Sequence, residues 1–371
     1  MLVGVPKEIK THEYRVGLTP GSVREYVARG HKMLVESGVG SGIGADDDAY
    51  RSAGATIAAN ADEVFARAQM IVKVKEPQPV EWKRLRQDQI LFTYLHLAPD
   101  PQQAKGLLAS GVTAIAYETV TDAKGGLPLL APMSEVAGRL SIEAAGAALR
   151  RFAGGPGLLL GGVPGVKPAN VLVIGGGVVG THAARMAVGL GAVVTILDRS
   201  IDRLRQLDDM FGGHARTRFS TIATIEEELA AADVVIGAVL VPGASAPKLV
   251  TRNMLSGMKP KAVLVDVAID QGGCFETSRP TTHDQPTYQV EGRVHYCVAN
   301  MPGAVPLTSS EALNNATLPF GLLLAEHGVA ALEEHAGLRA GLNVHRGMVT
   351  NQAVGDSLEL QFTPAAKALA A

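Results

Sequence analysis

One stretch in the middle of the chain, residues 171–198, constrains the fold more than any other. It reads as an apolar strand, a Gly-x-Gly-x-x-Gly turn, an alanine-rich helix, a second strand and a terminal acid. Gly175 would let the chain turn sharply, Gly177 would let backbone approach a pyrophosphate, and Gly180 would let the helix pack closely on the strand. The helix start would offer unpaired N–H groups and a positive dipole end to the phosphates. This order of elements predicts a dinucleotide-binding unit rather than a glycine-rich turn without a ligand.

The acid that closes the stretch indicates which dinucleotide would bind. Asp198 ends the second strand, where a carboxylate can accept hydrogen bonds from a ribose 2′-OH. The same carboxylate would repel a 2′-phosphate, so the sequence favours NAD over NADP. Arg199 follows and could soften that repulsion, although we interpret it as a solvated surface charge.

Apolar, strand-like runs alternate with helical stretches along most of the 371 residues, which is typical of a parallel α/β architecture. In the first third these runs lie at 2–5, 31–36, 70–75, 89–95 and 113–117. In the middle third they lie at 170–174, 193–198, 233–238, 262–267 and 294–298. A chain of this length exceeds one ordinary core. We therefore expect two doubly wound Rossmann-like domains joined by long helices, with the active-site cleft between them.

Helices and one irregular segment are predicted between and after these runs. Residues 134–152 read as one long helix, with Ser134 as a plausible N-cap. Residues 154–168 hold too many glycines and prolines for regular structure. A hairpin or flap is favoured there over a disordered linker, because its leucines would need burial. Residues 308–327 and 329–338 read as helices.

Composition excludes several classes of protein. Apolar residues at 47% and charged residues at 19% describe a well-buried globular chain. The net charge of −2 provides no basic face for nucleic acid, and the start of the chain lacks the features of a signal peptide. No uncharged apolar run reaches the roughly 18 residues that a membrane helix needs. Cys274 and Cys297 form no metal-binding spacing and are typical of a reducing cytoplasm, and Cys297 is expected in the core.

Polar side chains follow the predicted strands of the first unit. Lys75, His96 and Glu118 each come at the end of an apolar run, and Arg15 lies in the segment after the first strand. Ligands of open α/β sheets bind outside the carboxyl ends of the strands. Arg can bind a carboxylate through two hydrogen bonds, Lys can donate to a keto oxygen, and His can carry a proton. The group predicts an anionic carbonyl substrate, although a strand-end lysine is more often solvated and His96 could equally be structural.

Two segments of the second unit also end strands with polar residues. We expect Asp266 to brace the turn at the end of the strand 262–267, and Asp270 to face the nicotinamide side of the cofactor. Asn300 and Met301 follow the next strand and point at the cofactor, unless they serve only as turn and packing residues.

Seven motifs along essentially the whole chain point to one family. Besides the glycine turn they are the segments 3–20, 74–77 (VKEP), 93–98 (TYLHLA), 132–138 (PMSEVAG), 266–273 (DVAIDQGG) and 300–305 (NMPGAV). Together they resemble the L-alanine dehydrogenase family, which is close to the NAD-binding subunit of proton-translocating transhydrogenase.

The resemblance implies an NAD-dependent, reversible oxidative deamination of L-alanine to pyruvate and ammonium. Arg15 would bind the substrate carboxylate and Lys75 its carbonyl or amino side, whereas His96 would be the general acid/base and Asp270 a second catalytic group. The cofactor would contact Ser134, Gly175, Gly177, Val178, Gly180, Asp198, Arg203, Ser220, Val239, Leu240, Val267, Asp270, Arg279, Val298 and Met301.

The resemblance also implies a discontinuous domain. Residues 1–128 would start the substrate domain, 129–306 would form the NAD-binding domain, and the helices of 307–371 would return to the substrate domain. A cytoplasmic homohexamer would be the typical assembly. Some members of the family carry a metal site near the C-terminal helices, but residue 323 is Leu here, so no metal is expected despite His327.

Three other functions compete with this one. A transhydrogenase-type subunit would pass hydride to a partner protein and would need no amino-acid site, so Lys75 and His96 weigh against it. A non-catalytic NAD-responsive binding protein should lack such side chains. A reductase or dehydrogenase for another small oxo or amino acid stays open, because no residue identified here measures the volume of the substrate pocket.

Overall fold

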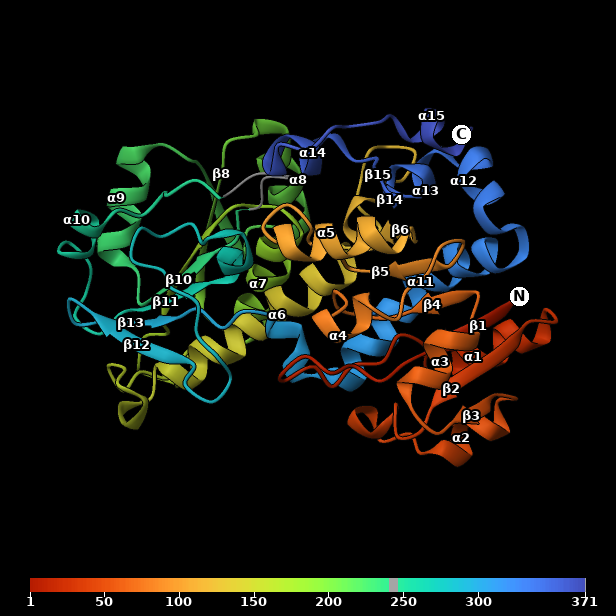
Figure 1. Cartoon of the computed structure of the whole chain (residues 1–371). Coiled ribbons are helices and arrows are strands. Elements are labelled where there is room, and N and C mark those ends of the chain that lie inside the picture. Colours follow the sequence, from red (N-terminus) through yellow and green to blue (C-terminus); the bar gives the residue numbers. More distant parts are fainter. Residues whose placement is uncertain (240–245, 371) are drawn as a thin grey trace. The chain divides into compact units, whose positions relative to one another are not determined.

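A computed structural model describes residues 1–239 and 246–370 and resolves two compact units (Figure 1). The first unit comprises Met1–Met133 and Gly303–Ala371, and the second comprises Ser134–Pro302. The units therefore change at 133/134 and 302/303, whereas the resemblance implies 128/129 and 306/307.

The first unit is built on a sheet in the order β15-β14-β6-β5-β4-β1-β2-β3. Strands β1 to β6 pair in parallel, and β14 and β15 add an antiparallel edge. The order β3-β2-β1-β4-β5-β6 is that of a doubly wound, dinucleotide-binding sheet. The strands are β1 (Leu2–Val5), β2 (Lys32–Glu36), β3 (Thr56–Ala58), β4 (Met70–Val72), β5 (Ile90–Thr93), β6 (Thr113–Ala116), β14 (Leu342–His345) and β15 (Met348–Val349).

Helices of this unit begin at recognisable capping residues. The side chains of Thr19, Asn60 and Asp100 each accept a backbone N–H of the helix that follows. Proline opens several of the helices, where its missing N–H removes no hydrogen bond. The helices are α1 (Pro20–Ala28), α2 (Asp47–Ser52), α3 (Ala61–Arg67), α4 (Pro79–Trp82), α5 (Pro101–Ser110), α11 (Pro306–His327), α12 (Ala331–Glu334), α13 (Ala336–Ala340), α14 (Gln352–Leu358) and α15 (Ala365–Leu369).

The second unit repeats the same topology. Its sheet runs in the order β12-β13-β11-β10-β7-β8-β9, with all neighbours parallel except the edge strand β12. The strands are β7 (Asn170–Ile174), β8 (Val193–Asp198), β9 (Ala215–Phe219), β10 (Val234–Gly237), β11 (Val263–Asp266), β12 (Thr287–Val290) and β13 (Arg293–Tyr296). The helices are α6 (Ala131–Ala148), α7 (Val178–Gly189), α8 (Ile201–Phe211), α9 (Ile222–Ala231) and α10 (Arg252–Leu255).

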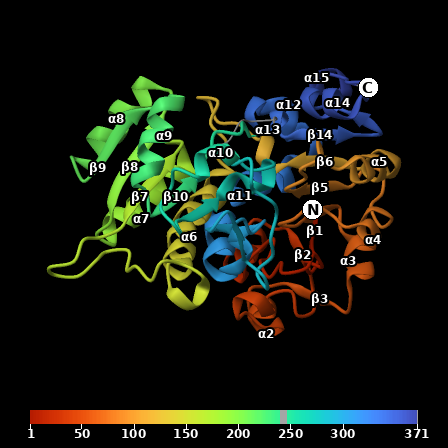
Figure 2. The same cartoon turned by 90° about the vertical axis from the view of Figure 1, so that its left-hand side faces the viewer.

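Helices cover both faces of this second sheet (Figure 2). Alternate strand residues such as Val171 and Val173 pack with α6, α7 and α8, whereas Leu172 and Ile174 pack with α9 and α10. Strands covered on both faces need apolar side chains at every position, which explains their continuous apolar runs. The expected fold class, α/β with two Rossmann-like units, is confirmed.

Several local expectations need correction. Helix α6 begins at Ala131, so Ser134 lies in its first turn and is not its N-cap, and the helix ends at Ala148 rather than at 152. Segment 154–168 forms only one isolated bridge, between Val163 and Val166. Its leucines are not all buried, because Leu159 is 64% exposed.

Residues 329–338 contain α12 and the start of α13 rather than one helix, with a break at His335. The expected strand 70–75 ends at Val72, so Lys75 lies beyond the sheet. Cys297 is buried, as predicted. Within the described residues no helix has both the length and the apolar character needed to cross a membrane.

Candidate functional site

The glycine turn between β7 and α7 has the geometry that a bound dinucleotide needs. Gly175 has φ +102°, and a Cβ added there would lie 2.7 Å from the carbonyl oxygen of Ala238. A Cβ on Gly180 would lie 1.8 Å from the carbonyl oxygen of Gly175, so no other residue fits without moving the backbone. Gly177 precedes α7, and a Cβ there would meet nothing within 4 Å. Gly175 and Gly180 are therefore demanded by the fold, whereas the space at Gly177 can receive a ligand.

Asp198 ties the end of β8 to the glycine turn. Its Oδ2 accepts the N–H of Gly176 and its Oδ1 the N–H of Ser200, each at 2.8 Å. A carboxylate offers about four lone-pair sites, so this half-buried group can still accept hydrogen bonds from a ribose. Arg199 is exposed, consistent with a solvated charge.

Arg203, from α8, braces the same turn. Its Nε donates to the carbonyl oxygen of Gly176 and its Nη2 to Oγ1 of Thr181, both at 2.7 Å. The guanidinium therefore holds the backbone of the turn.

Most of the other residues predicted to contact the cofactor lie at the carboxyl ends of the second sheet's strands. Val239, Ser220 and Val267 follow β10, β9 and β11, and the N–H of Ser220 donates to the carbonyl oxygen of Asp198 at 2.9 Å. Val178 opens α7 and is 41% exposed. Leu240 lies outside the described residues.

Three residues predicted to contact the cofactor make contacts within the protein: two pack in the core, and one lies over an aromatic ring. Val298 and Met301 have their side chains buried in the core, so their backbone is what a ligand could reach. Arg279 is exposed and places its guanidinium carbon 4.3 Å from the ring centroid of Tyr288.

Asp266 and Asp270 have different environments. Asp266 is buried and accepts the N–H groups of Ala268 and Phe275 and the hydroxyl of Ser278, so it braces the turn after β11, as predicted. Burial raises the pKa of its carboxyl, although the hydrogen bonds from Ser278 and Phe275 oppose the shift. Asp270 is exposed, and its Oδ1 accepts the N–H of Asn300 at 3.2 Å.

In the first unit, His96 is held in place at the end of β5. Its backbone has φ +48°, and its N–H donates to Oε1 of Glu118 at 2.6 Å. The ring stacks on Tyr94 with 5.7 Å between centroids and 6° between planes. Nδ1 lies 3.9 Å from Glu118 Oε1, and the side chain is 40% exposed. The backbone and one ring face are thus fixed, while the imidazole stays accessible.

Arg15 is buried and oriented by Glu13. Nε and Nη2 donate to the two oxygens of Glu13 at 2.7 and 2.5 Å, and Nη1 donates to the sulfur of Met133 at 3.0 Å. Sequence reasoning missed Glu13, although the Glu-x-Arg spacing inside the first motif was a usable signal.

Lys75 lies beside a second missed carboxylate, Glu76. Lys75 Nζ is 3.7 Å from Glu76 Oε2, and Lys10 donates to Glu76 Oε1. Burial by itself would raise the pKa of Glu76. The charges of Lys75 and Lys10 and the hydrogen bond from Lys10 outweigh burial, so the pKa lies below its usual value.

A buried ionic triad lies next to these residues, and its only sequence signal is a lysine within an apolar run. Lys73 is fully buried, with Nζ 3.1 Å from Glu8 Oε2 and 2.9 Å from Glu81 Oε1. Glu8 also accepts the N–H of Val74 at 2.7 Å. The triad therefore holds the segment that carries Lys75.

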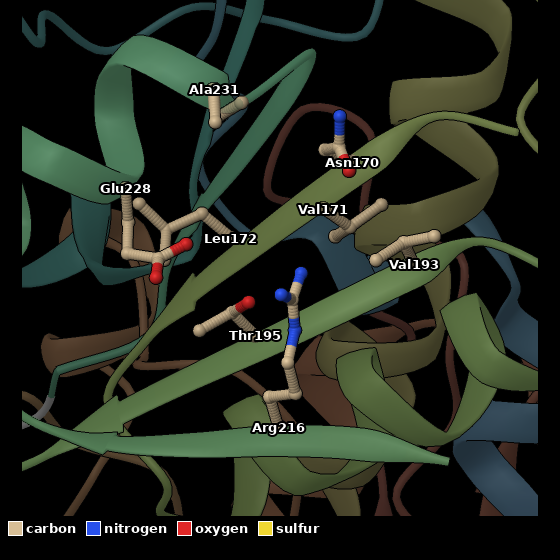
Figure 3. Close-up of a pocket in the computed structure, with 9 residues that line it drawn as sticks. Asn170, Val171, Leu172, Val193, Thr195, Arg216, Glu228 and Ala231 are labelled. Carbon is tan, nitrogen blue, oxygen red and sulfur yellow. The ribbon is translucent and has the colours of Figure 1, made fainter. Parts of the chain in front are cut away.

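A small pocket elsewhere carries none of this chemistry (Figure 3). It has a volume of about 20 Å³, room for about one water. It opens at the amino-terminal ends of β7 and β8, whereas the glycine turn follows the carboxyl end of β7. Its lining residues are Asn170, Val171, Leu172, Val193, Thr195, Arg216, Glu228, Ala231 and Ala232. Among the described residues, no group of three or more His, Cys, Asp and Glu could hold a metal ion.

Comparison with known proteins relates the whole chain to one family. Models of the N-terminal and C-terminal domains of alanine dehydrogenase/PNT match residues 4–137 and 141–352. The chain is 58% identical over 367 residues to an alanine dehydrogenase of Halomonas elongata, covering 99% of each chain. It is 55% identical over 371 residues to that of Bacillus subtilis, covering 100% of this chain and 98% of the relative.

Solved structures agree with these matches. An L-alanine dehydrogenase superposes with a TM-score of 0.94 at 52% identity, covering 97% of this chain and 99% of the other. A transhydrogenase from Sinorhizobium meliloti superposes with a TM-score of 0.80 at 26% identity, covering 95% and 100%.

Proposed function

Because this chain belongs to the alanine dehydrogenase/PNT family, we propose that it catalyses the reversible, NAD-dependent oxidative deamination of L-alanine to pyruvate and ammonium. The proposal rests on the presence in one chain of a dinucleotide-binding turn and of side chains suited to the substrate. A glycine turn closed by Asp198 suits a nicotinamide dinucleotide. The other unit holds Lys75 and His96 just beyond strand ends and Arg15 in the loop between β1 and α1. A cytoplasmic homohexamer is part of the proposal.

The residues of the second unit fit the cofactor. The open space at Gly177 and the N-terminus of the 12-residue helix α7 suit a pyrophosphate. Asp198 would accept hydrogen bonds from the ribose, and Asp270 would lie beside the nicotinamide. NAD, when bound, supplies the acceptor for the hydride from Cα of L-alanine.

The residues of the first unit would bind the substrate and move the proton. Glu13 fixes the plane of the Arg15 guanidinium, so the substrate carboxylate would be received in one orientation. The ammonium group of L-alanine first releases one proton, and loss of hydride from Cα of the resulting amine leaves an iminium group on the substrate. Water then adds to the iminium carbon as His96 takes its proton. The protonated imidazole returns this proton to the nitrogen of the carbinolamine, which collapses to pyruvate and ammonium. Lys75 would donate to the oxygen that becomes the carbonyl.

The proposal is tested by assaying the purified chain alone. We expect NADH to form when L-alanine and NAD are added, and to be consumed when pyruvate and ammonium are added together. L-Serine or glycine in place of L-alanine, and NADP in place of NAD, should support slower turnover. Hydride exchange between nucleotides without any response to alanine would instead indicate a transhydrogenase-type subunit, and faster turnover of another oxo or amino acid would identify a different substrate.

Cofactor choice is expected to depend on the charge of Asp198. Asp198→Asn keeps the shape and one acceptor for the Gly176 N–H but removes the negative charge. The ratio of kcat/KM for NAD to that for NADP should fall about tenfold or more, because a charge-assisted hydrogen bond is lost and repulsion of the 2′-phosphate is relieved. Asp208→Asn, an exposed acid on α8, should leave the ratio unchanged. An unchanged ratio in Asp198→Asn would remove this residue from cofactor selection.

A further inference from the structure

We propose that Glu76 is a substrate-binding residue whose Oε2 oxygen accepts hydrogen bonds from the ammonium group of L-alanine, and from the ammonium ion in the reverse reaction. This inference rests on the function proposed above and names a hydrogen-bond acceptor for the substrate's ammonium group, for which the proposed function provides none.

The first observation is an unsatisfied atom. Glu76 Oε2 is shielded from solvent and has no hydrogen-bond partner among the described residues. Lys75 Nζ, at 3.7 Å, lies beyond hydrogen-bond distance. A buried carboxylate oxygen that has lost its water without gaining a donor is destabilising. Such an atom needs a hydrogen-bond donor, and a bound ligand can supply it.

The second observation is the charge of the group. The other oxygen, Oε1, receives a hydrogen bond from Lys10. Lys10 and Lys75 keep the carboxyl ionised near neutral pH, so Oε2 offers a negative charge rather than a protonated hydroxyl. An ionised oxygen with unused lone pairs selects a ligand that donates hydrogen bonds and carries positive charge.

The third observation is that neighbouring carboxylates already have partners. The other acids near these strand ends are engaged by the Arg15 guanidinium for Glu13, by two backbone N–H groups for Glu118, and by the Lys73 ammonium for Glu8 and Glu81. Among these acids, and within the described residues, Glu76 alone keeps a solvent-shielded oxygen without a hydrogen bond.

The chemistry of the substrate completes the argument. L-Alanine carries a carboxylate and an ammonium group on one carbon, so its site needs cationic donors for the first and an anionic acceptor for the second. Lys75 and Glu76 are adjacent in the chain and place both charges at the end of β4. In the reverse reaction the same pair would hold the carbonyl oxygen of pyruvate and the incoming ammonium beside each other.

Glu76→Gln tests the inference because it keeps the size of the side chain and removes its charge. We expect the KM for ammonium and the KM for L-alanine to rise about ten- to a hundredfold, while the KM for pyruvate and for NADH changes less than about threefold. Glu76→Asp retains the charge on a shorter side chain and should give an intermediate KM for ammonium. Glu25→Gln, an exposed acid on α1, is the matched control and should behave as the unmodified chain.

The outcomes separate this inference from the proposed function. If the unmodified chain does not reduce NAD with L-alanine, the proposed function fails. If the unmodified chain is active and Glu76→Gln raises all KM values alike, or none, Glu76 does not bind the amino group. Thermal unfolding of each variant identifies a folding defect. If Glu76→Gln folds poorly, Glu76→Asp decides the question. Only a rise in the KM of Glu76→Asp for ammonium, without a similar rise for pyruvate and NADH, supports the inference.

Discussion

Replacing His96 by alanine is expected to lower kcat for alanine oxidation by about two to four powers of ten. The imidazole would take the proton from the water that attacks the iminium group, and its ring is accessible at this strand end. The ring is 40% exposed and packs mainly on Tyr94, so its removal should leave the fold intact. Steady-state rates at saturating L-alanine and NAD measure the effect.

Two measurements separate catalysis from binding in this variant. NADH binding, followed by the quenching of protein fluorescence, should be unchanged, because the glycine turn and Asp198 belong to the other unit. His214→Ala removes an exposed histidine just before β9 and should retain the full rate. Turnover of His96→Ala within a few-fold of the unmodified chain would show that the acid/base group lies elsewhere.

The sequence predicted the interior of both sheets better than their edges. Strands such as β7 and β11 read as continuous apolar runs because helices cover both faces of a parallel sheet. In contrast, β9 reads Ala-Arg-Thr-Arg-Phe and was not predicted. An edge strand can carry charged side chains, and β9 gains its structure by pairing with β8.

The start of α6 shows how two helix signals compete. Ser134 resembles an N-cap, but Pro132 fits equally well in a first turn, where no N–H is required. In the structure the helix begins at Ala131, so Pro132 lies in its first turn. Capping residues read from sequence thus place a helix start only to within about one turn.

The candidate site was predictable in its strand-end residues but not in their partners. Parallel topology brings Lys75 and His96 to one edge of the first sheet, because they follow the neighbouring strands β4 and β5. The carboxylate of Glu118 reaches the backbone of His96 from the next strand along. Such a contact depends on the register of two strands and on a side-chain rotamer, which the sequence pattern does not encode.

Lys73→Met is expected to destabilise the first unit by about 3–5 kcal/mol, because it leaves Glu8 and Glu81 without their cation in the interior. Methionine has a similar length, so the loss would come from charge rather than from a cavity. Trp82, the single tryptophan of the chain, adjoins Glu81 in α4, so its fluorescence during urea unfolding reports on this unit.

The pH dependence and a triple variant show whether charge is the cause. A carboxyl whose pKa is higher in the folded than in the unfolded state binds protons on folding, so its folded form loses stability as pH rises. Burial raises the pKa of Glu8 even with Lys73 present, and removing that cation should raise it further. The loss in Lys73→Met should therefore be larger at pH 7 than at pH 5. The triple variant Glu8→Gln, Lys73→Met, Glu81→Gln holds no buried charge and should recover most of the stability. A pH-independent loss that the triple variant does not recover would assign the effect to packing instead.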